Sequence, residues 1–371
     1  MIVAGEASGD LHAANLVREL YRLNPAVHVY GMGGGQLRAA GAKILIDSTK
    51  LAVVGLWEVL AHYREIKQVL GQLQSSLRDD PPDLLILVDY AEFNLKLAKT
   101  ARELGIKVFF YISPQVWAWR EKRVRKIKER VDLMGVLFPF EADFYRKHDV
   151  PVEYVGHPLI DHVEAGLSPQ ATREMLGLDA DEPVVALLPG SRKSEISRLM
   201  PLMNAAVAHI GKEDPRCRFV LPIAPGLERE LIVSHLEDPE RVVLVEGHAY
   251  DVMQIARAAI VASGTATLEC ALMGTPMAIV YRVAPLSYFL FKRLIRIPFV
   301  GLVNVIGGRE MAAEFIQDRA TAGNVGSEVL RLLRDESYHA ERRALLQEVR
   351  ERLGSGGGAR NAAAAALSLL T

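Results

Sequence analysis

Short apolar, β-rich runs alternate with stretches of helical periodicity along most of this 371-residue chain. Such alternation is typical of doubly wound α/β domains, in which helices cover both faces of a parallel sheet. The first series of predicted strands comprises Ile2–Ala4, Val27–Gly31, Leu84–Val88, Val108–Tyr111, Leu133–Val136 and Val152–Val155. The second series comprises Val184–Leu188, Arg218–Leu221, Val242–Val245, Ile260–Ala262 and Met277–Val280. Two series predict two domains, with the break near Gly156–Pro169.

The length agrees with two domains, because a domain averages roughly 150 residues. We expect Rossmann-like domains over 1–160 and 161–325, and helices over 326–371 with an interruption at Gly354–Gly358. These last helices are expected to pack back on the first domain or on a partner subunit. Ligands of open α/β sheets bind outside the carboxyl ends of the strands, so polar residues just after each strand are the candidates for function.

Composition excludes several other classes of protein. The net charge is −1 at pH 7, which gives no argument for nucleic-acid binding by the whole chain. The sequence has no uninterrupted run of about 18 apolar residues, the length needed to span a bilayer. Cys217 and Cys270 lack metal-binding spacing and are expected to be buried in a reducing compartment. Since Met1 leads straight into the first predicted strand, we expect a cytoplasmic protein.

The segment SGTATLE, residues 263–269, follows the predicted strand that ends at Ala262. A helix that begins after Thr265 would present the hydroxyls and free N–H groups of Ser263, Gly264 and Thr265 at its positive end, which favours a diphosphate. Glu269 lies one turn further on and could accept hydrogen bonds from a ribose diol. An ordinary turn with a small-residue cap and a solvated Glu is the alternative.

A second polar loop, Pro189-Gly190-Ser191-Arg192, follows the strand Val184–Leu188. It resembles a phosphate loop but lacks the ending and the full length of a P-loop. Arg192 could bind a leaving diphosphate through two hydrogen bonds, and an exposed Arg on a surface turn is the alternative. Asp179-Ala180-Asp181 matches the DxD pattern of metal-dependent sugar transferases. It precedes its strand and should lie at the opposite edge, so we interpret it as a surface loop.

The first series of strands ends in further unusual residues. Glu6 and Ser8 follow Ile2–Ala4 between two glycines; Ser8 and Asp10 suit helix capping, whereas Glu6 would face the ligand crevice. Asp89 ends an apolar strand, where it would be held rigidly and partly desolvated, as suits a general base. Capping of the next helix is the alternative for Asp89.

Aromatic and basic residues are concentrated in two further segments. Trp117, Trp119 and Arg120 precede a basic run to Arg130, which could bind single-stranded nucleic acid or anionic lipid, or be a solvated helix. The segment Leu286–Val300 combines many apolar and aromatic residues with three cations and no acid. This combination favours an interfacial helix on an anionic membrane, with a core helix whose cations reach water as the alternative.

Eight blocks occur in this order along nearly the whole chain: AGEASGD, VDYAEFN, ISPQVWAWR, FPFE, VGHPLID, LLPGSRKSEI, SGTATLE and NVIGGRE. Together they closely resemble the lipid-A-disaccharide synthases. This family of glycosyltransferases has the GT-B fold, in which two doubly wound Rossmann-like domains face each other across a cleft. The resemblance implies transfer of 2,3-diacylglucosamine from its UDP derivative to 2,3-diacylglucosamine 1-phosphate (lipid X), with release of UDP and without a cofactor.

The resemblance also implies roles for individual residues. Asp89 is the essential acid, and Arg192 binds phosphate. The nucleotide side comprises Ser263, Gly264, Thr265, Glu269, Asn304, Arg309 and Glu310, and we place Glu6, Ser8, Trp117 and Arg120 on the acceptor side. Two departures from the family pattern occur: Ala91 stands where the family usually has Pro, and the short first strand leaves open a start upstream of Met1.

The expected mechanism is a single inversion. Asp89 would take a proton from the acceptor's 6-hydroxyl while that oxygen attacks the anomeric carbon opposite UDP. Arg192 and the helix start at Ser263–Thr265 would stabilise the leaving diphosphate, so no metal is expected. A UDP-sugar epimerase and a non-catalytic UDP-sugar sensor are the alternatives. The family's exchange of C-terminal helices is compatible with a homodimer, and a diacylated acceptor implies peripheral work at the inner face of the cytoplasmic membrane.

Overall fold

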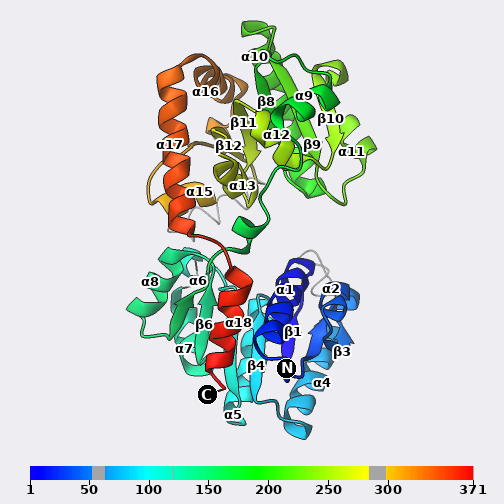
Figure 1. Ribbon diagram of the computed structural model, residues 1–371, viewed down its shortest axis with the longest axis vertical. Helices are drawn as coiled ribbons and strands as arrows, with labels where there is room; N and C mark the ends of the chain where they lie inside the picture. The colour runs from blue at the N-terminus through cyan, green and yellow to red at the C-terminus, as the bar shows by residue number, and fades with distance from the viewer. Residues whose placement is uncertain (52–62, 120, 284–297, 371) are drawn as a thin grey trace. The chain divides into compact units, whose positions relative to one another are not determined.

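The computed structural model describes residues 1–51, 63–119, 121–283 and 298–370 (Figure 1). The chain divides into two compact units. One unit joins Met1–Asp161 to Ser355–Thr371, and the other is His162–Gly354. Each unit contains a parallel sheet covered by helices, so the predicted fold class of two doubly wound α/β domains is confirmed.

The first unit has a seven-stranded sheet in the order β3-β2-β1-β4-β5-β6-β7. Its strands are β1 (Ile2–Ala4), β2 (Tyr30–Gly33), β3 (Lys43–Asp47), β4 (Leu84–Val88), β5 (Lys107–Tyr111), β6 (Leu133–Val136) and β7 (Val152–Tyr154). Its helices are α1 (Ala7–Leu23), α2 (Gly35–Ala39), α4 (Tyr63–Asp79), α5 (Ala91–Glu103), α6 (Val116–Trp119), α7 (Val124–Arg130), α8 (Pro139–Lys147) and α18 (Gly358–Ser368).

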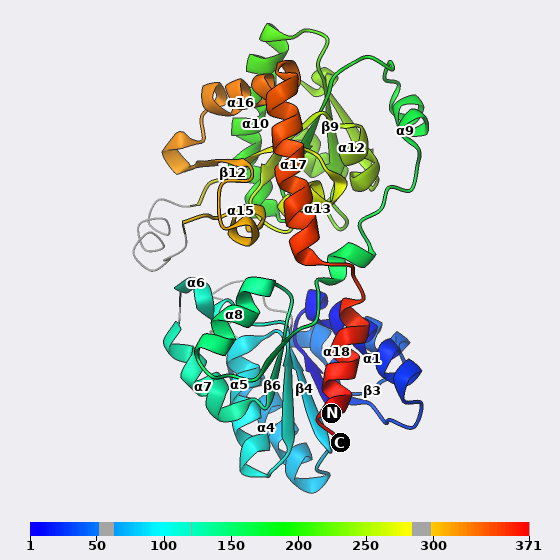
Figure 2. The same cartoon turned by 60° about the vertical axis from the view of Figure 1, so that its left-hand side comes forward.

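Alternate side chains of the central strands build two cores, one on each face of this sheet. Leu85 and Leu87 of β4 pack with α4, α5 and α7, whereas Ile86 and Val88 pack on the face covered by α1 and α18. A parallel strand buried on both faces must be apolar throughout, as β4 is. The last helix, α18, lies beside α1 although the two are far apart in the sequence (Figures 1 and 2).

The second unit has a six-stranded sheet in the order β10-β9-β8-β11-β12-β13. Its strands are β8 (Val184–Leu188), β9 (Arg218–Ile223), β10 (Val242–Glu246), β11 (Ala258–Ala262), β12 (Met277–Tyr281) and β13 (Ala313–Ile316). Its helices are α9 (Pro169–Leu176), α10 (Lys193–Glu213), α11 (Arg229–Val233), α12 (Ala249–Ile255), α13 (Ala266–Met273), α15 (Leu302–Gly307), α16 (Ala322–Arg334) and α17 (Glu336–Leu353).

The helices of the second unit also cover both faces of its sheet. Helices α10 and α16 pack against the main apolar core of the unit, and α12, α13 and α15 lie with α17 on the other side. The helical segment 326–371 is shared between the units, because α17 belongs to the second and α18 to the first. Cys217 and Cys270 are both buried, as predicted. Among the described residues, no helix has the length and apolarity needed to cross a membrane.

Each sheet has one point at which the strand order changes direction. In the first unit, β1 has β2 on one side and β4 on the other; in the second unit, β8 lies between β9 and β11. The connections leave such a strand pair in opposite directions, which opens a crevice at the carboxyl ends of the two strands. Loops that follow β1, β4, β8 and β11 therefore hold the first candidates for function.

Candidate functional site

The turn after β11 forms the start of a helix that lacks a side-chain cap. Helix α13 begins at Ala266 as predicted, and no described side chain caps it at Thr265. The Ser263 hydroxyl donates to the carbonyl oxygen of Val300 (3.0 Å), and the Thr267 hydroxyl donates to that of Gly264 (2.8 Å). The N–H groups of Thr267 and Leu268 already donate to the carbonyl oxygens of Gly264 (3.2 Å) and Thr265 (2.9 Å). The N–H groups that can bind an anion are therefore those just before them, of Gly264, Thr265 and Ala266.

Glu269 lies in the first turn of α13 and is held by Tyr250. The Tyr250 hydroxyl donates to Glu269 Oε1 at 3.2 Å. Burial raises the pKa of Glu269, and the hydrogen bond from Tyr250 lowers it. A carboxylate oriented in this way is a good acceptor for sugar hydroxyls. Sequence reasoning missed Tyr250, although this residue follows β10 in the first turn of α12 and could have been inspected on that ground.

The loop after β8 places Arg192 beside this turn. Strands β8 and β11 are adjacent and parallel, so their carboxyl ends lie side by side. The Glu195 carboxylate accepts hydrogen bonds from the N–H groups of Ser191 (3.1 Å) and Arg192 (3.2 Å), and it pairs with the Arg192 guanidinium (2.9 Å). Gly190 has φ +106°, and a Cβ there would overlap the Glu195 carboxylate, so the loop requires glycine. The Arg192 side chain is mostly exposed.

Asn304 is fully buried, and all of its hydrogen bonds are made within the protein. Its Oδ1 accepts from the N–H groups of Met311 (2.7 Å) and Ala312 (2.9 Å). Its Nδ2 donates to the Ala312 carbonyl and to Glu314 Oε1, both at 2.8 Å. Asn304 thus joins α15 to β13 and has no polar atom left for a ligand.

Arg309 and Glu310 lie in the connection between α15 and β13. The Arg309 guanidinium pairs with both oxygens of Glu348 on α17, at 2.8 and 2.9 Å. Glu348 lies twelve residues, or about 18 Å, along α17 from Glu336, which pairs with Arg257 at the amino end of β11, so Arg309 lies away from that end of the sheet.

Glu314 is a buried residue that sequence reasoning missed. Its carboxylate accepts from the N–H groups of Val300 (3.0 Å) and Gly301 (2.8 Å) and from Asn304. Because the carbonyl of Val300 accepts the Ser263 hydroxyl, Glu314 is connected to the helix start after β11. A lone Glu in the short strand β13 gave no sign of this connection.

In the first unit, Asp89 follows β4 in a strained turn. Asp89 and Tyr90 have φ angles of 49° and 48°, in the left-handed region. The side chain of Asn94 stabilises this turn, because its Nδ2 donates to the carbonyl oxygens of Val88 (3.2 Å) and Asp89 (2.6 Å). Burial, and next the negative charge of Glu6, raise the pKa of Asp89, while the Tyr90 N–H lowers it. Tyr90, not Asp89, takes the N-cap position of α5.

Glu6 and Ser8 follow β1, which pairs with β4, so their loop lies next to the turn of Asp89. Both side chains are exposed. Asp10 has a different role from the predicted capping of its own helix. Its carboxylate accepts from the N–H groups of Gly34 (2.6 Å) and Gln36 (2.9 Å), and so it caps α2 instead. That partnership spans more than twenty residues, which local spacing cannot predict.

Trp117 is half-buried on α6, after β5. Its indole N–H donates to Glu141 Oε1 at 3.1 Å, and its ring packs edge-on against Phe140 at 4.8 Å. Arg120 lies outside the described residues. So does 284–297, which includes most of the segment Leu286–Val300.

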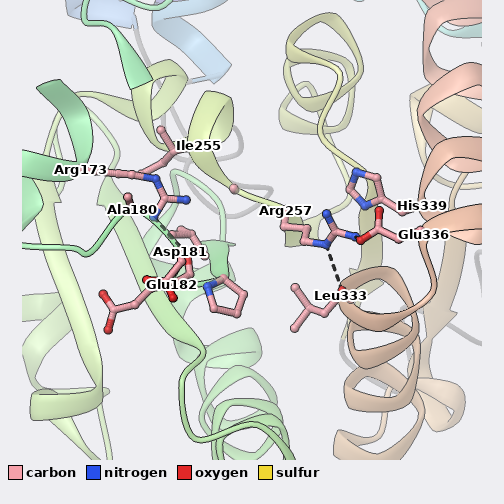
Figure 3. Close-up of a pocket in the computed structure, with 12 residues that line it drawn as sticks. Arg173, Ala180, Asp181, Glu182, Ile255, Arg257, Leu333, Glu336 and His339 are labelled. Carbon is pink, nitrogen blue, oxygen red and sulfur yellow. Dashed lines mark hydrogen bonds and ion pairs between the residues drawn. The ribbon is translucent and has the colours of Figure 1, made fainter. Parts of the chain in front are cut away.

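A pocket of about 390 Å³ lies at the amino ends of β8 and β11 (Figure 3). It is lined by Asp181 of the DxD-like segment, which lies before β8 as predicted. The two arginines are already engaged: Arg257 donates to the Leu333 carbonyl and pairs with Glu336, and Arg173 donates to the carbonyl oxygens of Asp179 and Glu182. Its position and its satisfied cations make this pocket a poor candidate. Within the described residues, no group of three or more His, Cys, Asp or Glu could hold a metal ion.

Comparison with known sequences identifies one family over nearly the full length. A family model described as lipid-A-disaccharide synthetase matches residues 1–368. The chain is 47% identical over 371 residues to the lipid-A-disaccharide synthase of Geobacter metallireducens, covering 100% of this chain and 97% of the relative. It is 43% identical over 363 residues to that of Coxiella burnetii strain RSA 331, covering 98% and 96%.

Solved structures of low sequence identity share the fold. The UDP-GlcNAc 2-epimerase of Neisseria meningitidis, bound to UDP-GlcNAc, gives a TM-score of 0.66 at 14% identity, covering 99% of this chain and 100% of that one. The calicheamicin glycosyltransferase CalG4 gives 0.63 at 17% identity, covering 100% and 97%. These similarities concern the fold alone, since both epimerases and transferases occur among them.

Proposed function

This chain belongs to the lipid-A-disaccharide synthase family, and on that premise we propose how its residues carry out the glycosyl transfer of lipid A biosynthesis. The donor is UDP-2,3-diacylglucosamine and the acceptor is 2,3-diacylglucosamine 1-phosphate. The reaction joins the two sugars and releases UDP. The first unit supplies the base for the acceptor, and the second unit binds the donor nucleotide.

Asp89 is the general base for the acceptor. It follows β4 at the switch point of the first sheet, and its pKa is raised by burial and by the charge of Glu6. A carboxylate with a raised pKa takes a proton more readily than an exposed Asp. Asp89 removes the proton from the 6-hydroxyl as that oxygen attacks the anomeric carbon. The position of Asp89 at the switch point and the raised pKa of its carboxyl group are the main support for this role. Glu6, Ser8 and Trp117 form the acceptor side around it.

The donor nucleotide binds at the switch point of the second sheet. The N–H groups of Gly264, Thr265 and Ala266, where α13 begins, and the Arg192 guanidinium bind the diphosphate and stabilise its charge as UDP departs. Glu269, oriented by Tyr250, accepts hydrogen bonds from the ribose hydroxyls. Asn304 and Glu314 act through Val300, by holding the turn at Ser263. We also place Arg309 and Glu310 on the nucleotide side, on the basis of the family resemblance. Since protein groups bind the diphosphate, the transfer proceeds without a metal.

The setting of the reaction follows from the substrates. A diacylated acceptor stays in the bilayer, so the enzyme works peripherally at the inner face of the cytoplasmic membrane. The cations and aromatic residues of Leu286–Val300 provide the contact with anionic lipid, on the basis of their sequence. The enzyme functions as a homodimer.

Thin-layer separation of lipid products tests the function against its two alternatives. With both labelled substrates and a metal chelator present, the purified chain should form a two-sugar lipid, and neither substrate alone should be consumed. Turnover of the UDP-sugar without acceptor would instead indicate an epimerase. Binding of UDP without any product would indicate a sensor. The 47% identity to a synthase favours the first outcome over the epimerase, which is similar only in fold.

A further inference from the structure

Glu141, on α8, carries a buried carboxyl group. Its side chain is only 3% exposed. One oxygen accepts hydrogen bonds from the N–H groups of Leu137 and Phe138, both at 3.2 Å, and the other accepts the indole N–H of Trp117 at 3.1 Å. A buried acid with this many donors fixes each of them relative to the others.

Trp117 begins a continuous row of aromatic rings that we call the aromatic row: Trp117, Phe140, Phe138 and His157. Successive ring centroids are 4.8, 5.5 and 5.0 Å apart. The four residues follow β5, β6 and β7 in turn, at the carboxyl ends of those strands. Since β4 neighbours β5 in the sheet, the row begins beside the strand that ends at Asp89.

We propose that Glu141 is a positioning residue for the acceptor: its carboxylate holds the indole of Trp117, and through that ring it orients the aromatic row toward the acceptor. This inference rests on the proposed acceptor role of the first unit. Trp117 is the member of the row whose ring itself is hydrogen-bonded to Glu141 among the described residues, whereas Phe138 is bonded to Glu141 through its backbone N–H. The rings of Phe140, Phe138 and His157 are positioned in turn, because each packs against the ring before it.

The charge state of Glu141 should control the strength of its hydrogen bond with Trp117. Burial raises its pKa to about 7, although the N–H groups of Phe138, Trp117 and Leu137 oppose the rise. Above that pH the carboxylate accepts a charge-assisted bond from Trp117, and below it the bond is to a neutral acid and is weaker. The charge-assisted hydrogen bond from Trp117 is therefore present at high pH and is lost as the pH falls through about 7.

Few other titratable groups face Glu141. The Tyr145 hydroxyl shares a hydrogen bond of 2.8 Å with Ser113, and burial raises the pKa of Tyr145 far above neutrality. At the far end of the row, burial and the charge of His12 lower the pKa of His157 to about 4. Neither group titrates near 7, and no described Lys or Arg forms an ion pair with Glu141. Arg120, three residues after Trp117, lies outside the described residues.

Indole N–H signals in nitrogen-15 NMR test the geometry without any need for turnover. The chain has three Trp residues, and the signal that disappears in Trp117→Phe belongs to Trp117. In the parent that signal should shift with pH, with a midpoint at about 7. In Glu141→Gln the shift should vanish, because Gln does not titrate. Glu153→Gln, the same change at an exposed position of β7, should keep it. A signal that titrates equally in Glu141→Gln would overturn the proposal.

Kinetics then test the link to the acceptor. Glu141→Gln keeps a side chain of the same shape, and circular dichroism can confirm that it folds. The KM for the acceptor should rise about tenfold, as expected for loss of one charge-assisted bond. The kcat at saturating acceptor and the affinity for UDP should stay within about twofold of the parent. Equal acceptor KM values in parent and variant would exclude the positioning role, and a parent that forms no two-sugar lipid would instead reject the proposed function.

Discussion

Burial raises the pKa of both Asp89 and Glu269, yet the two carboxyl groups have different neighbours. Asp89 faces the negative charge of Glu6, which favours uptake of a proton. Glu269 receives a hydrogen bond from Tyr250, which favours the charged form. The first environment suits a base that must accept a proton, and the second suits a fixed acceptor for sugar hydroxyls. The carboxyl group therefore serves two roles because of what surrounds it.

Replacing Asp89 with Asn should remove most of the turnover and leave UDP affinity almost unchanged. Asn cannot accept the proton of the acceptor hydroxyl, and loss of general base catalysis costs roughly 10²–10⁴ in rate. The matched control is Asp149→Asn, the same change at an exposed residue whose left-handed backbone Asn also tolerates. Steady-state turnover and calorimetry with UDP make the comparison. Near-normal turnover in Asp89→Asn would reject its assignment as the base.

Arg192→Ala and Glu269→Ala should each weaken UDP binding. Each removes charge-assisted hydrogen bonds to the nucleotide, which corresponds to an affinity loss of about ten- to a hundredfold. The control is Arg216→Ala, an exposed Arg at the amino end of β9. Isothermal titration with UDP measures all three. Unchanged affinity in both site variants would place the nucleotide elsewhere in the molecule.

Among the structural elements, the turns after the strands depend on partners that lie far away in the sequence. Glu314 on β13 holds the backbone of Val300 and Gly301, and Val300 in turn accepts the hydroxyl of Ser263 at the start of α13. Asn304 completes the same cluster from α15. The turn at Ser263 that precedes α13 is therefore held by groups that contact no nucleotide in our proposal.

Glu314→Gln should weaken UDP binding although Glu314 is not expected to touch the nucleotide. The amide can accept fewer of the backbone N–H bonds, so the turn at Ser263 loses its support, and we expect an affinity loss of about tenfold. Glu336→Gln is the control, because Glu336 lies in the same unit at the amino ends of the strands. Calorimetry, with thermal unfolding to confirm the fold, makes the test. A variant that binds UDP as tightly as the parent would show that the turn is independent of Glu314.

The sequence allowed the central elements to be predicted, because an apolar strand followed by a polar turn is a local pattern. Strands such as Leu84–Val88 and Val184–Leu188 coincide with their predicted bounds. The edge strands β3 and β13 were missed, since polar residues such as Lys43 and Glu314 interrupt the apolar pattern by which the other strands were found. The predicted strand Val27–Gly31 was partly wrong, because pairing in the sheet begins only at Tyr30.

The part of the candidate site that could be predicted comprises residues that directly follow central strands. Asp89, Arg192 and Ser263–Thr265 lie at the carboxyl ends of central strands, which the order of the strands alone indicates. Glu141 and Tyr250 were missed because their importance lies in a hydrogen bond to a partner remote in the sequence. Asn304, which the resemblance put on the nucleotide side, makes four hydrogen bonds to three protein residues, Met311, Ala312 and Glu314.

At the scale of the whole molecule, our proposal assigns membrane association to the segment Leu286–Val300. Replacing Phe289 and Phe291 together with Ser should lower binding to anionic liposomes by tenfold or more, because two aromatic rings leave the acyl boundary. Sedimentation with liposomes compares the double variant with the parent, and circular dichroism confirms that both are folded. If the folded variant binds as tightly as the parent, this segment is not the anchor, and the basic stretch Arg120–Arg130 becomes the next candidate.

Both units carry their candidate site at the switch point of a parallel sheet, and the proposed reaction needs one group from each. The first supplies a base, and the second supplies groups that bind the leaving diphosphate. These two roles determine the stereochemistry of the reaction. If Asp89 only removes a proton and forms no covalent bond to the sugar, the acceptor oxygen attacks once, from the side opposite UDP.

The anomeric configuration of the product therefore tests the central claim most directly. Proton NMR of the purified two-sugar lipid gives the coupling constant of the anomeric proton of the new linkage, and the same coupling measured in the donor is the reference. The account predicts opposite configurations at this carbon in donor and product. A product that retains the configuration of the donor would require two displacements through a covalent intermediate, and it would contradict the role of Asp89 as a general base.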